Sequence, residues 1–375
     1  MRQLYERVLS MLRDISFDSI WSGFNLMDFA LYNNTTVYLA DGEIPYDNRF
    51  LGNSSIVYNG GQLAIWEISN EEEVIIEELV ASIVHEMFHS YQSEQGECRY
   101  PNDLIGLDYP LELDNYCYKY EENKLIVRAI DSNDYREKME LLHKFITYRE
   151  YRINKFGEII KYEWYTETLE GVAEYVGTKA LEQISYDLYK KRITEYKKII
   201  NNLDMVFDVR RCSYYTGTLF LLLLDDMNIP IPSRIKDEKI TIFEQIAKHF
   251  HEDYLILPHL NKYSNDLLGA EIEPALTRVE YITIIEEKFT EYNTNKNKLF
   301  QDFFDNNIKK EEGNFSICGY DPMNMVKIDG KIFCSHFINL MNKDTREAIF
   351  IQGPIVLISE INSYHDVSGY FILEE

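Results

Sequence analysis

The sequence predicts an α+β protein in which a strand-rich stretch, a long helical region and a second strand-rich stretch follow one another. Three observations support this order. Runs of β-branched and aromatic residues lie between Asn and Gly turns before residue 70. Apolar residues then recur every three or four positions up to about residue 300, and short β-type runs return near the C-terminus. We therefore expect a first region at 1–300, subdivided into 1–70, 71–182 and 183–300, and a small β domain at 301–375.

The N-terminal region is expected to begin with a helix and to continue as a sheet. Charged residues are scattered through residues 1–20, so we expect no signal peptide, and Met1 should start a helix. Strands are predicted at Thr36–Leu39, Ser55–Tyr58 and Leu63–Trp66, where β-branched and aromatic residues are separated by Asn and Gly.

A long helix is predicted after these strands. Its start fits a capping box in either of two registers, Ser69 with Glu72 or Asn70 with Glu73, and Gln95–Gly96 is a typical stop. The helix has an apolar stripe that should face a core, with residues three or four positions apart: Ile76, Val80, Ile83, Met87 and Tyr91.

The same helix carries the pentad His85-Glu86-Met87-Phe88-His89, which has the form His-Glu-x-x-His. Two histidines four positions apart leave one face of a helix one turn apart and can bind one metal ion, commonly zinc. Glu86 points about 100° away from His85, so its carboxylate can reach a water at the metal without being a ligand. With 8 His in 375 residues, composition alone would give this pentad about 0.02 times per chain. The alternative is a core helix whose histidines are satisfied by carbonyl groups.

The segment of about 104–153 is expected to form two further helices, at Asp114–Ile130 and Tyr135–Lys155. The second of them carries Arg149 and Arg152, which could pair with acids or with a substrate carboxylate. Because most ion pairs form at the protein surface, we expect surface pairing for both arginines.

A second functional helix is predicted at Tyr162–Ala180. Four acids follow one another on it at steps of four, three and four, so they share one stripe: Glu163, Glu167, Glu170 and Glu174. A solvated acidic face would explain such a stripe on an ordinary helix. However, Gly171 lies beside it, and a Gly inside a helix costs about 1 kcal/mol relative to Ala, which indicates close approach by another element. A divalent cation and imidazole N–H groups would balance these acids.

Glu170-Gly171-Val172-Ala173-Glu174-Tyr175 resembles the Glu-Gly-x-Ala-x-Tyr helix of the gluzincin metallopeptidases, the thermolysin-like and aminopeptidase-like zinc enzymes. The resemblance implies a zincin-like core in which His85, His89 and Glu170 hold one catalytic Zn²⁺ and Glu174 orients a ligand histidine. Glu170 follows His89 by 81 positions (170 − 89), whereas gluzincins have a gap of roughly two dozen residues. The helices at 104–153 would then be an insertion that loops out between the two motif helices. Glu167 is the nearest rival as the third ligand.

Arg211–Gly217, followed by the apolar run Leu219–Leu224, is similar to the Tyr-x-x-Gly helix start of aminopeptidase-type gluzincins. This resemblance implies that Tyr214 stabilises the substrate oxyanion, and Tyr215 is the next candidate. The Gly-Ala-Met-Glu-Asn segment that anchors the substrate in the exopeptidases has no counterpart in the stretch before the motif helix. In zincins a sheet strand above the cleft can pair its free edge with an extended peptide, and Leu63–Trp66 is our candidate for that strand.

The C-terminal stretch is predicted to form a small β domain. Its β-type runs are short and separated by turn residues: Phe315–Cys318, Met325–Ile328, Lys331–Phe337, Ala348–Gln352, Pro354–Leu357 and Gly369–Leu373. Between two of these runs, Asp329–Gly330 is typical of a tight hairpin turn.

Charge and composition argue against several classes of partner. With 38 basic and 63 acidic residues the net charge is −25, which repels nucleic-acid phosphate and anionic lipid and mildly favours neutral or basic peptides. No stretch approaches the ~18 apolar residues of a membrane span.

Five cysteines without a close pair predict reduced thiols in a cytoplasm and no structural zinc. His249 and His251 form a His-x-His whose side chains would point in different directions on a helix, so we expect no site there. The other histidines have no ligand-like neighbours in the sequence: His143, His259, His336 and His365.

Together the motifs predict a zinc-dependent peptidase that acts on a peptide or protein substrate, with Glu86 as the general base. Two segments outside the motifs, Trp21–Asn25 and Gly319–Pro322, are similar to uncharacterised bacterial zinc peptidases. The alternative is a catalytically inactive protein of zincin fold that binds its partners through the C-terminal β domain.

Overall fold

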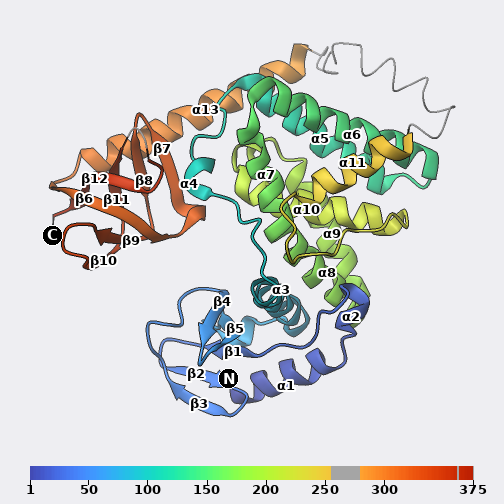
Figure 1. Cartoon of the computed structure of the whole chain (residues 1–375), viewed down its shortest axis with the longest axis horizontal. Helices are drawn as coiled ribbons and strands as arrows, with labels where there is room; N and C mark the ends of the chain where they lie inside the picture. Colours follow the sequence, from blue (N-terminus) through green and yellow to red (C-terminus); the bar gives the residue numbers. More distant parts are fainter. Residues whose placement is uncertain (255–278, 361–362, 375) are drawn as a thin grey trace.

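The computed structural model describes residues 1–254, 279–360 and 363–374 and shows an α+β fold (Figure 1). A mostly antiparallel five-stranded sheet near the N-terminus is followed by helices and then by an antiparallel seven-stranded sheet near the C-terminus. The predicted α+β class is therefore confirmed. His259, for which we expected no ligand-like neighbours, lies outside the described residues.

The N-terminal sheet has the strand order β3-β2-β1-β5-β4, in which β1 and β5 are parallel and the other neighbours antiparallel. Its strands are β1 (Phe29–Tyr32), β2 (Thr36–Leu39), β3 (Gly42–Pro45), β4 (Ser54–Tyr58) and β5 (Gly61–Glu67). All three predicted strands are present. The predicted free edge at Leu63–Trp66 is wrong, because β5 pairs with β1 on one side and β4 on the other. The turn Asn59–Gly60, with φ of 50° and 85°, folds β4 against β5 and makes β4 the edge.

Most of the chain between the two sheets is helical. The helices are α1 (Arg2–Arg13), α2 (Phe17–Ile20), α3 (Ile76–Glu94), α4 (Asp103–Gly106), α5 (Leu113–Asp131), α6 (Tyr135–Phe156), α7 (Lys161–Thr166), α8 (Val172–Ile184), α9 (Tyr186–Ile200), α10 (Val209–Asp226), α11 (Ile242–Tyr254) and α13 (Val279–Phe304). The helices predicted at the N-terminus and in the segment 104–153 are confirmed by α1, α5 and α6. Within the described ranges, no helix combines the length and the apolar character needed to cross a membrane.

The motif helix α3 begins later than the sequence predicted. Asn70 caps a short 3₁₀ turn at Glu71–Glu73, where its side chain accepts a hydrogen bond from the Glu72 amide at 3.1 Å. Val74 is extended and separates this turn from α3, so neither capping-box register caps the α-helix itself. The predicted stop is confirmed, because Gln95 is the C-cap and Gly96 has a φ of 74°. Four of the five residues of the predicted apolar stripe are buried, and Tyr91 is half-buried.

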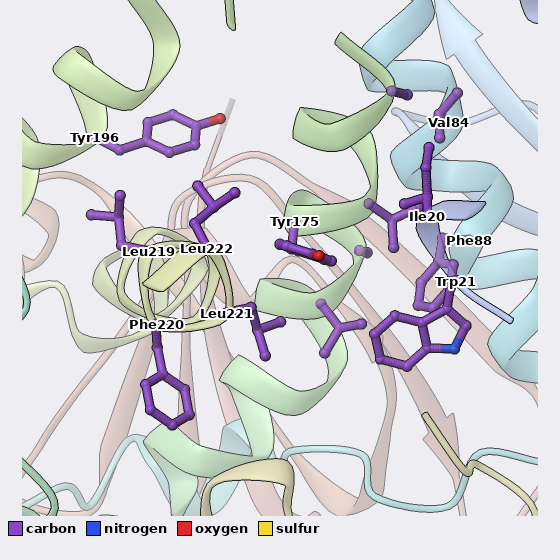
Figure 2. Packing of buried hydrophobic residues seen from close by; sticks show 14 of the residues in the cluster. Ile20, Trp21, Val84, Phe88, Tyr175, Tyr196, Leu219, Phe220, Leu221 and Leu222 are labelled. Atoms are coloured by element: carbon purple, nitrogen blue, oxygen red, sulfur yellow. The ribbon is translucent and has the colours of Figure 1, made fainter. Parts of the chain in front are cut away.

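The main hydrophobic core lies where α3, α8 and α10 pack together. Figure 2 shows Tyr175 of α8 between Phe88 of α3 on one side and Leu222 of α10 on the other. α8 is therefore the central helix of this layer, and it places the residues at its N-terminal end beside the motif face of α3.

Two glycines allow the helices of this core to approach closely. A Cβ on Gly177 of α8 would lie 2.6 Å from the carbonyl oxygen of Ala81 in α3. A Cβ on Gly171 would lie 2.9 Å from the Cα of Gly217 in α10. Because both neighbours are backbone atoms, a larger residue would force the helices apart. The close approach predicted at Gly171 is confirmed, and its partner is α10.

The second functional helix is interrupted by a π-helical turn at Glu167–Gly171, which joins α7 to α8. Three of its four acids are buried and the fourth, Glu174, is nearly so, so a solvated acidic face is wrong. Each acid is paired with a basic side chain. π-helical turns are rare and often mark functional sites.

Arg149 and Arg152 were expected to pair at the surface, and this prediction is wrong because both side chains are 0% exposed. They belong to a buried ion network of three cations and three carboxylates: Lys119, Arg149, Arg152, Glu122, Glu163 and Glu167. The cations and Glu122 come from α5 and α6, which direct them towards the acids of α7 and the π-helical turn. Opposite charges in equal number make this burial tolerable.

The C-terminal sheet has the strand order β10-β9-β6-β12-β11-β8-β7, and all its neighbours are antiparallel. Its strands are β6 (Ile308–Tyr320), β7 (Met325–Ile328), β8 (Lys331–Cys334), β9 (Phe337–Asn342), β10 (Ala348–Gln352), β11 (Ile355–Ser359) and β12 (Asp366–Leu373). The predicted strands are confirmed, except that the run Lys331–Phe337 divides between β8 and the start of β9. The predicted hairpin turn Asp329–Gly330 is also confirmed, with φ of 47° and 73°.

Candidate metal centre

Three side chains that the sequence predicted as metal ligands converge at the contact between α3 and the π-helical turn. The Nε2 atoms of His85 and His89 are 3.1 Å apart. The Oε2 atom of Glu170 lies 3.1 Å from Nε2 of His89 and 3.8 Å from Nε2 of His85. In the part of the chain that the structure describes, no other group of His, Cys, Asp and Glu side chains is arranged to hold a metal ion.

The spacing of these three atoms fits a tetrahedral ion. Zinc bonds of 2.0–2.2 Å in a tetrahedron separate the ligand atoms by about 3.3–3.6 Å. The observed separations of 3.1, 3.1 and 3.8 Å lie around that value. Two imidazoles and one carboxylate from two helices can therefore hold one metal ion and leave a fourth position open.

Hydrogen bonds on the far side of each imidazole fix which ring nitrogen carries the proton. Nδ1 of His85 lies 2.8 Å from Oε2 of Glu174, and a carboxylate can only accept. Nδ1 of His89 lies 2.8 Å from Oε1 of Gln92. The oxygen and nitrogen of the Gln92 amide cannot exchange places, because Nε2 donates a hydrogen bond to the carbonyl oxygen of Leu169 at 3.1 Å. Both Nδ1 atoms are therefore donors.

When both rings are neutral, the two Nε2 atoms, 3.1 Å apart, therefore present lone pairs to the same point. Two facing lone pairs repel unless a cation or a proton lies between them. A metal ion satisfies both, together with the carboxylate of Glu170. This is the strongest observation in favour of a metal site, because it concerns the donor atoms themselves.

Glu174 is ionised where it orients His85. Burial would raise the pKa of Glu174, but the hydrogen bond to His85 and the charges of His85 and Arg192 lower it to about 2. Tyr196 of α9 also donates a hydrogen bond to the same carboxylate. Glu174 thus lies where the resemblance implied, beside a histidine of the candidate metal centre. Sequence reasoning missed Tyr196 and Arg192, which have no local pattern that links them to α8.

The outer oxygen of Glu170 is held by a residue that the sequence analysis did not identify. Arg210 of α10 donates from Nη2 to Oε1 of Glu170 at 2.8 Å, and its other terminal nitrogen pairs with Asp103 of α4. Burial would raise the pKa of Glu170, but the charges of His89 and Arg210 and the hydrogen bonds from both histidines hold it well below its usual range. Arg210 thereby fixes the carboxylate so that Oε2 faces the histidines.

Glu167, the rival third ligand, does not face the histidines. It accepts hydrogen bonds from Nη1 of Arg149 at 2.5 Å and from the hydroxyl of Thr216 at 2.7 Å. The wider π-helical turn rotates each residue by less than the 100° of an α-helix, which directs Glu167 and Glu170 to different partners. Of the two carboxylates, Glu170 alone reaches His89.

Glu86 lies on α3 between the two histidines and is 9% exposed. Among the residues that the structure describes, its carboxylate has no hydrogen-bond or salt-bridge partner. Burial raises the pKa of Glu86, and the charges of His85 and His89 oppose that shift only in part. An unpaired, buried carboxylate next to a candidate metal centre is a candidate proton acceptor.

Of the two tyrosine candidates, Tyr214 lies beside the metal centre. Its ring is nearly parallel to that of His85, with centroids 6.2 Å apart. Burial and the charge of Glu170 raise the pKa of Tyr214, so its hydroxyl keeps its proton and can donate. Tyr215 packs against Tyr196 instead, with centroids 4.8 Å apart.

The sequence analysis also missed Gln92, although the sequence contains a signal for this residue: Gln92 follows His89 by three positions and so shares its face of α3.

We expect Gln92→Leu to weaken zinc binding by about 10–100-fold, because the Nδ1 proton of His89 loses its acceptor. Competition with a chromogenic chelator would measure this change in Kd. Gln95→Leu, at the exposed end of the same helix, is the matched control and should bind zinc as wild type does. Equal affinity in both variants would contradict the assignment of Gln92.

The site thus combines a group able to hold one metal ion, an unpaired carboxylate and a protonated phenol within one contact between helices. These groups are the components of metal-assisted hydrolysis. No protein-family model, curated protein or solved structure matches this chain.

Proposed function

We propose that this protein is a zinc-dependent peptidase of gluzincin type. The observation that carries the proposal is the convergence of the Nε2 atoms of His85 and His89 with the carboxylate of Glu170, beside the unpaired carboxylate of Glu86. Two imidazoles and one carboxylate are a usual donor set for catalytic zinc, which keeps one position open. The net charge of −25 is compatible with neutral or basic peptides as substrates.

Each remaining residue has a role that its position supports. Zinc bound there would polarise a peptide carbonyl and make a water acidic near pH 7. Glu86 accepts the proton of the attacking water and passes it to the leaving amine. Tyr214 donates a hydrogen bond to the carbonyl oxygen as negative charge develops on it. Glu174 and Gln92 keep both imidazoles in the tautomer that exposes Nε2.

The arrangement around the site supports a zincin-like core. The motif helix α3 packs on β5 and β4 of the N-terminal sheet, and α8 packs on the opposite side of α3. The edge strand β4 lies next to the metal centre, so its free backbone groups could pair with an extended peptide. This role passes from Leu63–Trp66 to β4, because β5 has no free edge.

Metal removal tests the proposed function directly. We expect the purified chain to hold one zinc per molecule and to cleave members of a broad peptide library. Dialysis against a chelator should abolish cleavage, and stoichiometric zinc should restore it. Metal analysis and mass spectrometry of the peptides would measure both. One zinc per chain without cleavage of any peptide would favour the alternative, a zincin-fold protein that binds its partners without hydrolysing them.

A further inference from the structure

A pocket of about 260 Å³ opens directly beside the metal centre. His89 and Glu170 form the wall that it shares with the metal ligands. The facing wall comes from β4, β5 and α3, and most of its side chains carry hydroxyl or amide groups: Ser54, Ser55, Gln62 and Ser93. A substrate residue next to the cleaved bond would place its side chain here, because the pocket borders the metal ligands themselves.

The polar wall is held in place by its own hydrogen bonds. The hydroxyls of Ser55 and Ser90 lie 2.7 Å apart, which ties β4 to the buried side of α3. Ser55 also donates to Oε1 of Gln62 at 3.3 Å, and Nε2 of Gln62 donates to the hydroxyl of Ser93 at 3.0 Å. This chain of bonds crosses from the sheet to the helix and fixes the orientation of the Gln62 amide.

The same bonds determine what the wall offers to a ligand. Within the described part of the chain, the second N–H of the Gln62 amide and the O–H of Ser93 have no protein acceptor. Oε1 of Gln62 and the hydroxyl oxygens retain further lone pairs. The pocket can therefore donate to and accept from a side chain that has both kinds of group.

Charged and apolar side chains fit this wall less well. The one carboxylate among the described lining residues, Glu170, is already held by His89 and Arg210, and no Lys or Arg lines the pocket. A basic or acidic side chain would thus lose its hydration without gaining an opposite charge. An apolar side chain would remove water from Gln62 and Ser93 and leave their polar groups unpaired.

We infer that this pocket is a subsite for an uncharged polar side chain, Asn, Gln, Ser or Thr, in a residue that flanks the cleaved peptide bond. The inference rests on the proposed peptidase function and names the substrate class of that site. The polar wall therefore selects which substrate side chain is bound and takes no part in the chemical step, since none of its residues contacts the donor atoms of the metal ligands.

Matched fluorogenic peptides test the inference on the zinc-loaded full chain. Pairs would differ at one flanking position, Gln against Leu and Asn against Leu, which have similar size. We expect kcat/KM to be several-fold, up to about tenfold, higher for the polar member, because the apolar member covers Gln62 and Ser93 without replacing their hydrogen bonds to water. Gln62→Leu should reduce or invert this ratio, and Ser93→Ala should reduce it with less disturbance of the wall. Ser82→Ala, on α3, is the control and should keep the wild-type ratio, because among the described residues its hydroxyl bonds only to the Glu78 carbonyl.

The outcomes separate this inference from the proposed function. Zinc-dependent cleavage with equal rates for Gln and Leu at both flanking positions would overturn the subsite and leave the peptidase intact. A polar preference that survives unchanged in both Gln62→Leu and Ser93→Ala would also overturn it, since the preference would then arise elsewhere. If wild type cleaves no peptide with or without zinc, the proposed function fails and this inference fails with it.

Discussion

Replacement of Glu86 by Gln is expected to leave zinc in place and to lower kcat by about 10²–10⁴-fold, the usual contribution of a general base. Glutamine has nearly the same size and shape but cannot accept the proton of the attacking water. Since Glu86 has no hydrogen-bond or salt-bridge partner among the described residues, the substitution breaks no hydrogen bond or ion pair. Metal analysis and steady-state kinetics on the same preparation would measure both effects.

The control for this variant is Glu94→Gln, which makes the same change at an exposed position of α3. It should match wild type in zinc content and in kcat. Activity retained in Glu86→Gln would remove the general-base assignment. Loss of zinc in that variant would instead show that Glu86 takes part in holding the ion.

Replacement of Arg149 by Met is expected to lower the free energy of unfolding by about 3–5 kcal/mol, the cost of leaving one partner of a buried ion pair uncompensated. Arg149 is 0% exposed and pairs with Glu167, and it also lies near Glu122. Without it the buried ion network would carry one more negative than positive charge. Denaturant titration, followed by circular dichroism, would measure the shift.

Arg136→Met makes the same change on the same helix α6, at a side chain that is 77% exposed and paired only loosely with Glu140. It should alter stability by less than about 0.5 kcal/mol. The double variant Arg149→Met with Glu167→Met should be more stable than Arg149→Met alone, because it removes both members of the pair. Equal stability of the Arg149 and Arg136 variants would contradict the buried network.

The buried ion network also explains the long gap between the two motif helices. The residues between His89 and Glu170 include α5 and α6, and these helices supply the charges that balance Glu163 and Glu167. Glu167 starts the π-helical turn that carries Glu170, so its pairing with Arg149 fixes the backbone of that turn. The helices at 104–153 thus do more than connect the motifs: they neutralise the acids next to Glu170 and hold its turn in place.

Local patterns predicted the elements well because each depends on neighbours within a few residues. The periodic apolar positions of α3, α5 and α6 and the Asp329–Gly330 turn required no knowledge of the fold. Predictions that depended on distant partners were less successful. The free edge of the sheet depended on where β1 pairs, and the surface placement of Arg149 and Arg152 depended on which helix would cover them.

The same contrast between local patterns and distant partners applies to the candidate site. The sequence by itself determined that His85 and His89 share one face of a helix and that Glu86 lies between them, since helical rotation sets those directions. It also narrowed the candidates for a third ligand to Glu170 and Glu167. Only the tertiary structure decided between these two carboxylates, through the π-helical turn and the positions of Arg149 and Arg210. The physical reason is range: backbone geometry fixes residues one turn apart, whereas the partner of a buried charge is chosen by the packing of elements far apart in the chain.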